Sequence, residues 1–298
     1  MDEFKEKFIH LLHYPNISWK TVFQMLKKDP SLQSVYRAPI STIPSNPIYP
    51  AVSHDSSLTS VTSFSSESIH EQIRQYKTND IDVITIFDKE YPRVLKEIYQ
   101  PPWALYAKGD IALLEKEPKL AVVGSRQATP YGKKAIRHIF PDLIHQDILI
   151  VSGLATGIDA LAHEETIKLD GKTIGVIAGG LYHIYPKENL PLAVKMMQTQ
   201  LVLSEYPPDT KPLRWHFPAR NRIISGLSTG TFIIEAKRKS GSLITANYAV
   251  HEGRDVFSLP GSIFNPCSEG ANELIQQGAK LVSCAKDILE ELKYNPIQ

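Results

Sequence analysis

The chain has 298 residues, a formal net charge of +1 and 42% hydrophobic residues. This length suits one large domain or two ordinary ones, and 33 basic against 32 acidic residues exclude a histone-like polycation and a solvating acidic tail. Nucleic-acid binding is not excluded, because a basic patch can lie within a balanced total.

The two isolated cysteines and the lack of long apolar runs indicate the cellular compartment of the protein. Cys267 and Cys284 are isolated in the sequence, which excludes a disulfide scaffold and fits a reducing environment. The N-terminus lacks the continuous apolar region of a signal peptide, and no stretch approaches the roughly 18 apolar residues of a membrane span. We therefore expect a soluble, cytoplasmic protein.

The first segment predicts a small helical module over residues 1–38. Residues 3–14 and 18–28 carry apolar side chains at helical spacing, and Ser18 suits the N-cap of the second helix. The turn between them has no glycine, unlike that of a DNA-binding helix-hairpin-helix. The pattern leaves open whether the module binds DNA or a partner, and whether it extends to residue 77.

Residues 39–68 differ in composition from the rest of the chain. They contain ten serines, three threonines and four prolines, with no lysine or arginine. Such a segment is typical of a linker or an irregular region. Beyond it, residues 69–77 predict a short helix, residues 82–87 a strand, and residues 91–110 a connection interrupted by prolines.

From Lys119 onward, short apolar runs alternate with helical patterns, which predicts a mainly parallel sheet covered by helices on both faces. We assign residues 69–298 to one doubly wound α/β domain. The apolar runs that predict strands are KLAVVG, ILIVSG, TIGVIAG, LVLSEY, TFIIEA, DVFSLPG and KLVS. The helices predicted to follow them, in the same order, cover residues 130–146, 157–169, 188–198, 218–227, 241–252, 270–277 and 285–292.

Small residues follow several of these strands, where α/β sheets bind ligands beyond the carboxyl ends of the strands. Glycine and serine let phosphates approach backbone N–H groups, and Arg126 adds a bidentate donor. The alternative is that these are ordinary strand-to-helix turns. The segments concerned are Gly124–Arg126, Ser152–Gly157, Ala178–Gly180 and Lys239–Thr245.

Nucleotide and catalytic motifs are incomplete. The sequence after the first strand does not complete a dinucleotide fingerprint, and Gly171-Lys172-Thr173 lacks the first glycine of a phosphate-binding loop. Asp159 and His163, four residues apart on one helix, could form an acid/base pair or instead serve as a helix cap and a packed histidine. We expect no catalytic residue, no metal and no cofactor.

Positive charge is concentrated in one segment. Between Lys211 and Lys239 lie seven basic residues and only Glu235 as an acid, with Trp215, His216 and Phe217 interleaved. Basic residues beside aromatic ones suit single-stranded nucleic acid, whose phosphates take the charge while bases stack on rings. A solvated basic face with core aromatics is the alternative.

Two arginines of this segment stand in an unusual place. Arg220 and Arg222 lie in the first turn of a predicted helix, where positive charge opposes the helix dipole unless an anion is bound. Either arginine could instead pair with Glu205, which ends a neighbouring strand.

Linked motifs give a resemblance to a known family. VVGSR, SGLATGIDALAH, TIGVIAGGLYHIYP, FPARNRIISGLS, SGSLITA and GRDVFSLPG, in this order, resemble the DNA-processing protein A (Smf) family. The resemblance extends from about Tyr91 to Val282. It implies an extended Rossmann-like domain behind an all-helical (SAM-like) module, without the C-terminal winged helix of some members.

The resemblance also implies a function. Members of this family bind and protect single-stranded DNA without sequence preference, and as homodimers load a RecA-type recombinase onto it in natural transformation and homologous recombination. They have no established catalytic activity, and a single-strand-binding protein is a further candidate partner. The predicted nucleic-acid-binding residues are Gly124, Ser125, Arg126, Arg214, Phe217, Arg220, Asn221, Arg222, Lys237, Ser240, Gly241 and Ser242.

Two other functions compete with this prediction. A nucleotide-processing hydrolase of the phosphoribohydrolase type could use the same scaffold, because Thr229–Glu235 resembles part of its catalytic loop, although Leu227 and Ser228 replace its paired glycines. A scaffold whose basic patch meets an acidic protein is the third possibility. In the preferred interpretation, the arginines hold phosphates and Phe217 or Trp215 stacks a base.

Overall fold

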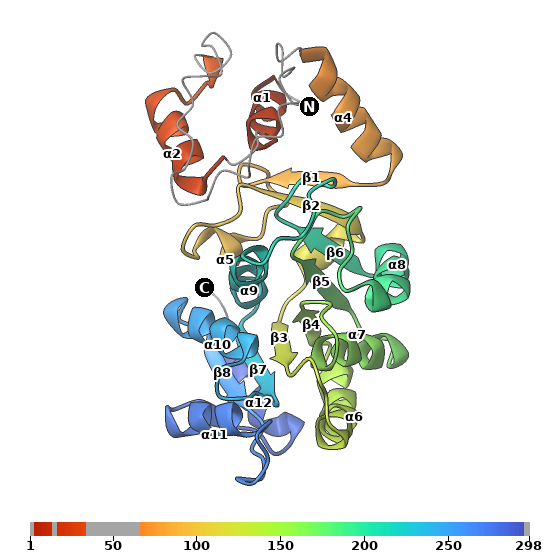
Figure 1. The fold of residues 1–298 in the computed structure, drawn as a ribbon, viewed down its shortest axis with the longest axis vertical. Helices are drawn as coiled ribbons and strands as arrows, with labels where there is room; N and C mark the ends of the chain where they lie inside the picture. The colour runs from red at the N-terminus through yellow and green to blue at the C-terminus, as the bar shows by residue number, and fades with distance from the viewer. Residues whose placement is uncertain (1–2, 14–16, 34–65, 295–298) are drawn as a thin grey trace. The chain divides into compact units, whose positions relative to one another are not determined.

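The computed structural model describes residues 3–13, 17–33 and 66–294, which fall into two units. The first unit is Met1–Thr85 and the second is Ile86–Gln298 (Figure 1). Most of the predicted linker, residues 39–65, lies outside the described residues.

The first unit contains the two predicted helices, α1 (Glu3–Leu12) and α2 (Trp19–Lys28), with α4 (Ser66–Thr78) and β1 (Asp82–Thr85). The Ser18 hydroxyl accepts a hydrogen bond from the Thr21 N–H at 3.0 Å, so Ser18 caps α2 as predicted. Ile9 packs against Ile73 and Val83, which places α1 against α4 and β1. Helix α4 thus falls in the same compact unit as α1 and α2, whereas the sequence left open whether residues 69–77 belong to the helical module or to the α/β domain.

The second unit is built around a mainly parallel sheet in the order β2-β6-β5-β4-β3-β7-β8-β9. The core strands are buried on both sides, as their continuous apolar runs require. The strands are β2 (Ala104–Gly109), β3 (Lys119–Gly124), β4 (Leu149–Ser152), β5 (Thr173–Ile177), β6 (Leu201–Ser204), β7 (Gly230–Ile234), β8 (Asp255–Ser258) and β9 (Lys280–Leu281).

Strand β2 corrects the sequence prediction, which treated residues 91–110 as a connection. β2 pairs antiparallel with β6, with Tyr106 opposite Ser204. The prolines before Trp103 led to the prediction of a connection, because proline usually ends an element. They do not prevent the next element from starting two residues later. Short elements α5 (Arg93–Lys96) and η2 (Ile111–Leu114) flank β2.

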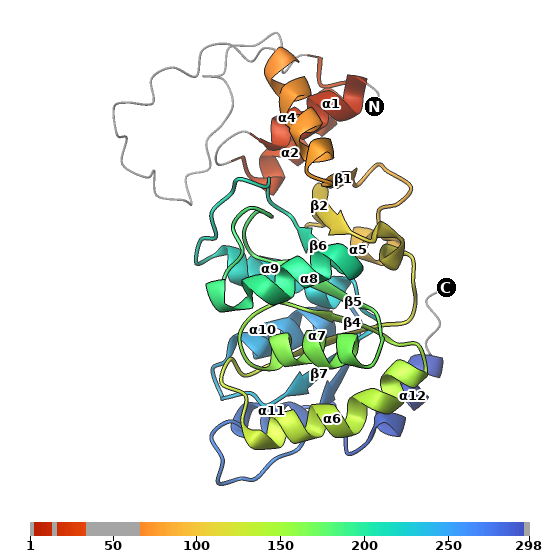
Figure 2. The same cartoon turned by 90° about the vertical axis from the view of Figure 1, so that its right-hand side faces the viewer.

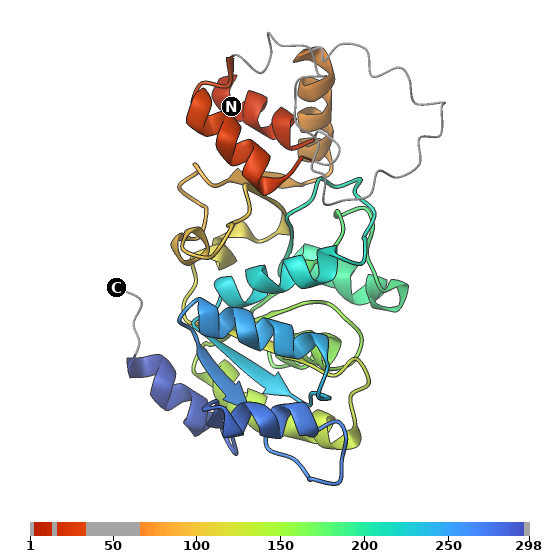
Figure 3. The same cartoon turned by 60° about the vertical axis from the view of Figure 1, so that its left-hand side comes forward.

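Helices cover both faces of the sheet, so the doubly wound α/β fold is confirmed. Helices α6, α7 and α8 lie on one face (Figure 2), and α9, α10 and α11 lie on the other (Figure 3). Their bounds are α6 (Pro130–His145), α7 (Ile158–Lys168), η3 (Lys187–Asn189), α8 (Leu190–Thr199), α9 (His216–Gly226), α10 (Gly241–His251), α11 (Glu269–Gln276) and α12 (Ala285–Tyr294).

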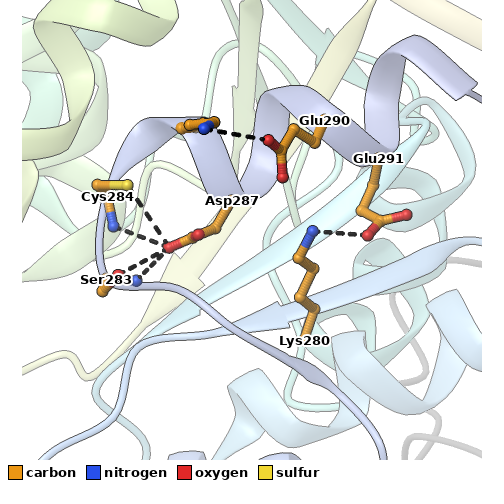
Figure 4. A network of polar contacts seen from close by, with 7 residues as sticks. Lys280, Ser283, Cys284, Asp287, Glu290 and Glu291 are labelled. Atoms are coloured by element: carbon orange, nitrogen blue, oxygen red, sulfur yellow. Dashed lines mark hydrogen bonds and ion pairs between the residues drawn. The ribbon is translucent and has the colours of Figure 1, made fainter.

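The last helix, α12, begins with a network of hydrogen bonds around Asp287 (Figure 4). Its carboxylate accepts from the N–H groups of Ser283 at 2.7 Å and Cys284 at 3.0 Å, which satisfies donors that the helix start leaves free. The Ser283 N–H lowers the pKa of Asp287, with further contributions from Cys284. Ile288 then packs with Ile139 and Phe140 of α6 in the main hydrophobic cluster.

The direction in which successive strands are added across the sheet reverses at β3, and this reversal positions the functional site. From β3 the strands β4, β5 and β6 follow on one side, whereas β7, β8 and β9 follow on the other. In open α/β sheets the crevice at such a switch point, beyond the carboxyl ends of the strands, is the usual ligand site. Here that crevice lies between the ends of β3 and β7, where Gly124 is paired with Ile234.

Candidate nucleic-acid interface

A pocket of about 900 Å³ lies at the switch point, and we call it the switch-point pocket. Apart from Arg222, every residue predicted to bind nucleic acid lines it, although these residues come from three separate segments of the chain. The predicted residues in its lining are Gly124, Ser125, Arg126, Arg214, Phe217, Arg220, Asn221, Lys237, Ser240, Gly241 and Ser242.

The loop after β3 supplies Arg126 and depends on two glycines. A Cβ on Gly124 would lie 1.9 Å from the Ile234 carbonyl oxygen, so only glycine allows β3 to approach β7 this closely. Gly157 has φ +81°, and a Cβ there would lie 2.3 Å from the Ser125 carbonyl oxygen. The Ser125 hydroxyl accepts from the Gln127 N–H at 3.1 Å and so closes the loop. Arg126 is left exposed at the pocket.

Helix α9 brings an aromatic ring to the pocket. Phe217 lies in its first turn, and the Arg126 guanidinium carbon lies 5.8 Å from the centre of the Phe217 ring. His216 points elsewhere: it is buried and stacks on Tyr206 with ring centres 3.9 Å apart. Trp215 is half-exposed but does not line the pocket, so Phe217 is the ring that the pocket presents from this helix.

Arg220 forms part of the floor of the pocket. Only 5% of the residue is exposed, and its Nη1 donates to the carbonyl oxygens of Gly153 and Val176. Burial lowers the pKa of Arg220 to about 10, and Asp159 opposes that shift, so the guanidinium is charged at neutral pH. Arg220 is therefore a fixed positive charge under the pocket, because its backbone contacts hold it in place.

Arg222 is the predicted site residue that the structure places elsewhere. Its guanidinium donates to the Glu205 carboxylate, and 11% and 17% of these two side chains are exposed. Arg220 and Arg222 are two residues apart on a helix, which turns them by about 200° relative to each other. The ion pair with Glu205, which the sequence left open for either arginine, is formed by Arg222.

The start of α10 forms a third side of the pocket. Ser240 occupies the N-cap position without a hydrogen bond from its side chain to the backbone of the helix. Its hydroxyl instead hydrogen-bonds the Ser242 hydroxyl, and Asn221 donates to the Gly241 carbonyl oxygen at 3.2 Å. The first N–H groups of α10, together with exposed Lys237, are suited to bind an anion.

The acid/base interpretation of Asp159 and His163 does not fit the geometry. His163 is buried, its Nδ1 lies 2.7 Å from the Thr173 hydroxyl, and burial lowers its pKa to about 3. Burial raises the pKa of Asp159, while Arg220 and backbone N–H groups oppose the rise. His163 is thus a neutral packed histidine, and Asp159 and Arg220 each favour the charged form of the other.

The hydrolase alternative depended on Glu235, and this residue is engaged away from the pocket. Its carboxylate accepts from the Thr129 N–H at 2.9 Å and from the Thr129 hydroxyl, at the start of α6. Glu235 does not line the switch-point pocket. Within the described part of the chain, no group of three or more His, Cys, Asp and Glu side chains could hold a metal ion.

Sequence reasoning missed other residues of the pocket, above all Tyr185. This residue lies between β5 and α8, and its ring centre is 5.7 Å from that of Phe217. The available signal was its position after a parallel strand, at the same sheet edge as the glycine loops. Apart from Asp159, the residues of the lining that lie outside both the predicted binding residues and the predicted ligand loops are Val123, Gln127, Tyr185, Pro212 and Pro218.

A family model described as "DNA recombination-mediator protein A" matches residues 82–293. The chain belongs to this family. The DNA processing protein DprA of Bacillus subtilis (strain 168) is 52% identical to the chain over 223 residues, which cover 75% of each protein. DprA of Streptococcus pneumoniae is 50% identical over 210 residues, which cover 70% of this chain and 74% of that one.

Solved structures of the recombination-mediator family have the same fold. The X-ray structure of DprA from Streptococcus pneumoniae gives a TM-score of 0.76 at 39% identity and covers 96% of this chain and 97% of that one. A structure of DprA from Helicobacter pylori, described by its single-stranded DNA binding mode, gives 0.65 at 32% identity, covering 72% and 96%. No helix among the described residues is long and apolar enough to cross a membrane.

Proposed function

We propose that this protein binds single-stranded DNA in the switch-point pocket and delivers the strand to a RecA-type recombinase. The observation that carries the proposal is the composition of the pocket in a member of this family. Exposed Arg126, Arg214 and Lys237, the start of α10 and the Phe217 ring all line it. The description of the Helicobacter pylori relative by its single-stranded DNA binding supports the choice of ligand.

The charges of the pocket suit the phosphate backbone. Arg126 and Lys237 extend into solvent, Arg220 holds a charge at the floor, and the N–H groups at the start of α10 add donors. None of these groups requires a particular base, because phosphates are the same at every nucleotide. Binding in this pocket should therefore be insensitive to sequence.

The Phe217 ring favours single strands. A base can stack on a protein ring only when a face of the base is free, and each such stack contributes about 1–3 kcal/mol. In a duplex, both faces of an internal base are already covered by neighbouring bases. The ring beside the Arg126 charge thus supplies a preference that charge alone does not give.

The recombinase step belongs to the same proposal and is supported by membership in a recombination-mediator family. In this role the protein protects incoming DNA and loads the recombinase during natural transformation and homologous recombination. It acts without a catalytic reaction of its own, as a homodimer, in the cytoplasm. A single-strand-binding protein is a further partner, because this protein would have to displace it from the DNA or bind the DNA alongside it.

The binding step is tested by fluorescence anisotropy with a labelled oligothymidine and a duplex of equal length at several salt concentrations. With four to six phosphate contacts, the logarithm of the association constant for the single strand should fall against log salt with a slope of about −3 to −4. The duplex should bind more weakly. A flat salt response, or equal binding of duplex and single strand, would contradict the proposal.

The loading step is tested with single-stranded DNA that is already covered by a single-strand-binding protein. The DNA-dependent ATPase of a RecA-type recombinase is followed with and without this protein, which should shorten the lag. Arg126→Ala should remove most of that effect. An unchanged lag with the wild-type protein, while DNA binding is intact, would restrict the function to binding alone.

A further inference from the structure

Two aromatic rings from different segments meet at the switch-point pocket. Tyr185, between β5 and α8, and Phe217, at the start of α9, have ring centres 5.7 Å apart and ring planes inclined by 72°. Both line the pocket, and 54% of Tyr185 is exposed. The pocket thus presents two ring surfaces in nearly perpendicular orientations.

The segment that carries Tyr185 is anchored at both ends. The Gly180 N–H donates to the Thr210 carbonyl oxygen at 2.7 Å, and Asn189 Nδ2 donates to the Leu154 carbonyl oxygen at 2.8 Å. A Cβ on Gly180 would lie 2.1 Å from the Pro207 carbonyl oxygen, so this end of the segment packs directly on neighbouring backbone. The backbone on either side of Tyr185 is therefore held in place, so a ligand that uses the Tyr185 ring does not have to order this segment.

We propose that Tyr185 stacks a second base beside the one on Phe217, and that the two inclined rings select an unpaired, splayed dinucleotide over duplex DNA. This inference depends on the proposed function, because it names the part of the strand that the same pocket recognises. Tyr185 would act as a specificity-determining residue: it contributes little to charge and much to the distinction between one strand and two.

The geometry explains the selection. Neighbouring bases in a duplex are parallel and about 3.4 Å apart along the strand. Two bases that stack on rings inclined by 72° cannot stay parallel to each other, so the step between them must open. A single strand opens at small cost, whereas a duplex must also break base pairs, which costs a few kcal/mol for each extruded base.

A different role for Tyr185 is to hold the Phe217 ring in place without touching DNA. In that case the two residues act as one unit, and removal of both should cost no more than removal of Phe217 alone. If each ring stacks its own base, the double variant should bind clearly more weakly than Phe217→Ala, although the two losses need not multiply because the rings are in contact. Measurement of the double variant therefore separates these two roles of Tyr185.

The test compares Tyr185→Ala, Phe217→Ala and the double variant with the wild type, by anisotropy on oligothymidine and on duplex. Each single variant should bind the single strand about 5- to 150-fold more weakly, as expected for the loss of one stack. The double variant should bind more weakly than either single variant. The salt slope should remain that of the wild type, because neither ring carries a charge.

Two controls make the result specific. Tyr182→Ala removes another half-exposed tyrosine of the same segment, which does not line the pocket, and it should bind like the wild type. Tyr185→Phe keeps the ring and should bind within about 2-fold of the wild type. In addition, photocrosslinking with an iodouridine oligonucleotide should label the peptide that contains Tyr185 in the wild-type protein.

Each outcome is decisive. Wild-type binding by Tyr185→Ala, or a double variant no weaker than Phe217→Ala, would overturn the second stacking site while leaving the proposed function intact. Equal weakening on single strand and duplex by Tyr185→Ala would overturn the selection. Failure of the wild-type protein to bind single strands would instead overturn the proposed function itself.

Discussion

The Arg222 guanidinium donates to the Glu205 carboxylate, and this ion pair is largely buried on the opposite side of α9 from the pocket-lining Arg220. Two arginines that look equivalent in the sequence therefore have separate tasks. Arg220 places a charge under the switch-point pocket, whereas Arg222 joins α9 to the end of β6.

Replacement of Arg222 by alanine should therefore reduce stability more than DNA binding. The change leaves the Glu205 carboxylate buried without its partner, and we expect the free energy of unfolding in urea to fall by about 3–5 kcal/mol. The salt slope of DNA binding should not change. Arg222→Met combined with Glu205→Leu should recover most of the stability. If Arg222→Ala instead kept full stability and reduced the magnitude of the salt slope by about 0.7, Arg222 would lie at the DNA.

Replacement of Arg126 by alanine should weaken binding to all single-stranded sequences alike. The variant loses a phosphate contact, so the magnitude of the salt slope should fall by about 0.7. Anisotropy on oligothymidine, oligodeoxycytidine and a mixed sequence measures both effects. Arg137, an exposed arginine of α6 outside the pocket, is the matched control, and Arg137→Ala should leave the slope unchanged.

Two glycines of the site should respond differently to alanine. Gly157 has φ +81° and no room for a Cβ, so Gly157→Ala should lower the free energy of unfolding by about 1–3 kcal/mol. Around Gly241 a Cβ would meet nothing within 4 Å, so Gly241→Ala should keep the stability. It should nevertheless weaken DNA binding, because the methyl group would occupy the approach to the start of α10. Unchanged affinity would exclude a phosphate at that helix end.

Glu252 should make stability depend on pH. Burial raises the pKa of Glu252 from 4.5 to about 7, and the Ser225 hydroxyl and neighbouring arginines oppose the rise. Between about pH 4.5 and 7 the folded protein holds this proton more tightly than the unfolded chain, so the contribution of Glu252 to stability falls as pH rises.

The test is Glu252→Gln, which cannot ionise. The difference between its free energy of unfolding and that of the wild type should increase from pH 5 to pH 8, because only the wild type loses stability over this range; urea unfolding at each pH measures it. Glu164→Gln, at an exposed position of α7, is the control and should run parallel to the wild type. Parallel curves for Glu252→Gln as well would show that the buried carboxyl does not titrate in this range.

The alternation of apolar runs and helical patterns was enough to predict the mainly parallel sheet, because strands buried on both faces need uninterrupted apolar residues. Ser18 as the N-cap of α2 followed from the same local reasoning. Strand β2 did not, because its membership in the sheet comes from antiparallel pairing with β6, about a hundred residues further along the chain. The sequence around β2 does not predict pairing with so distant a strand.

By itself, the sequence determined which loops carry small and basic residues and that they follow parallel strands, since both are local properties. The tertiary structure decided which of those loops meet: the reversal at β3 brings the ends of β3 and β7 together at one pocket. It also turned Arg222 toward Glu205 and placed Tyr185 beside Phe217. These contacts depend on the packing of distant segments and on the face that each helix presents, so only the folded chain fixes them.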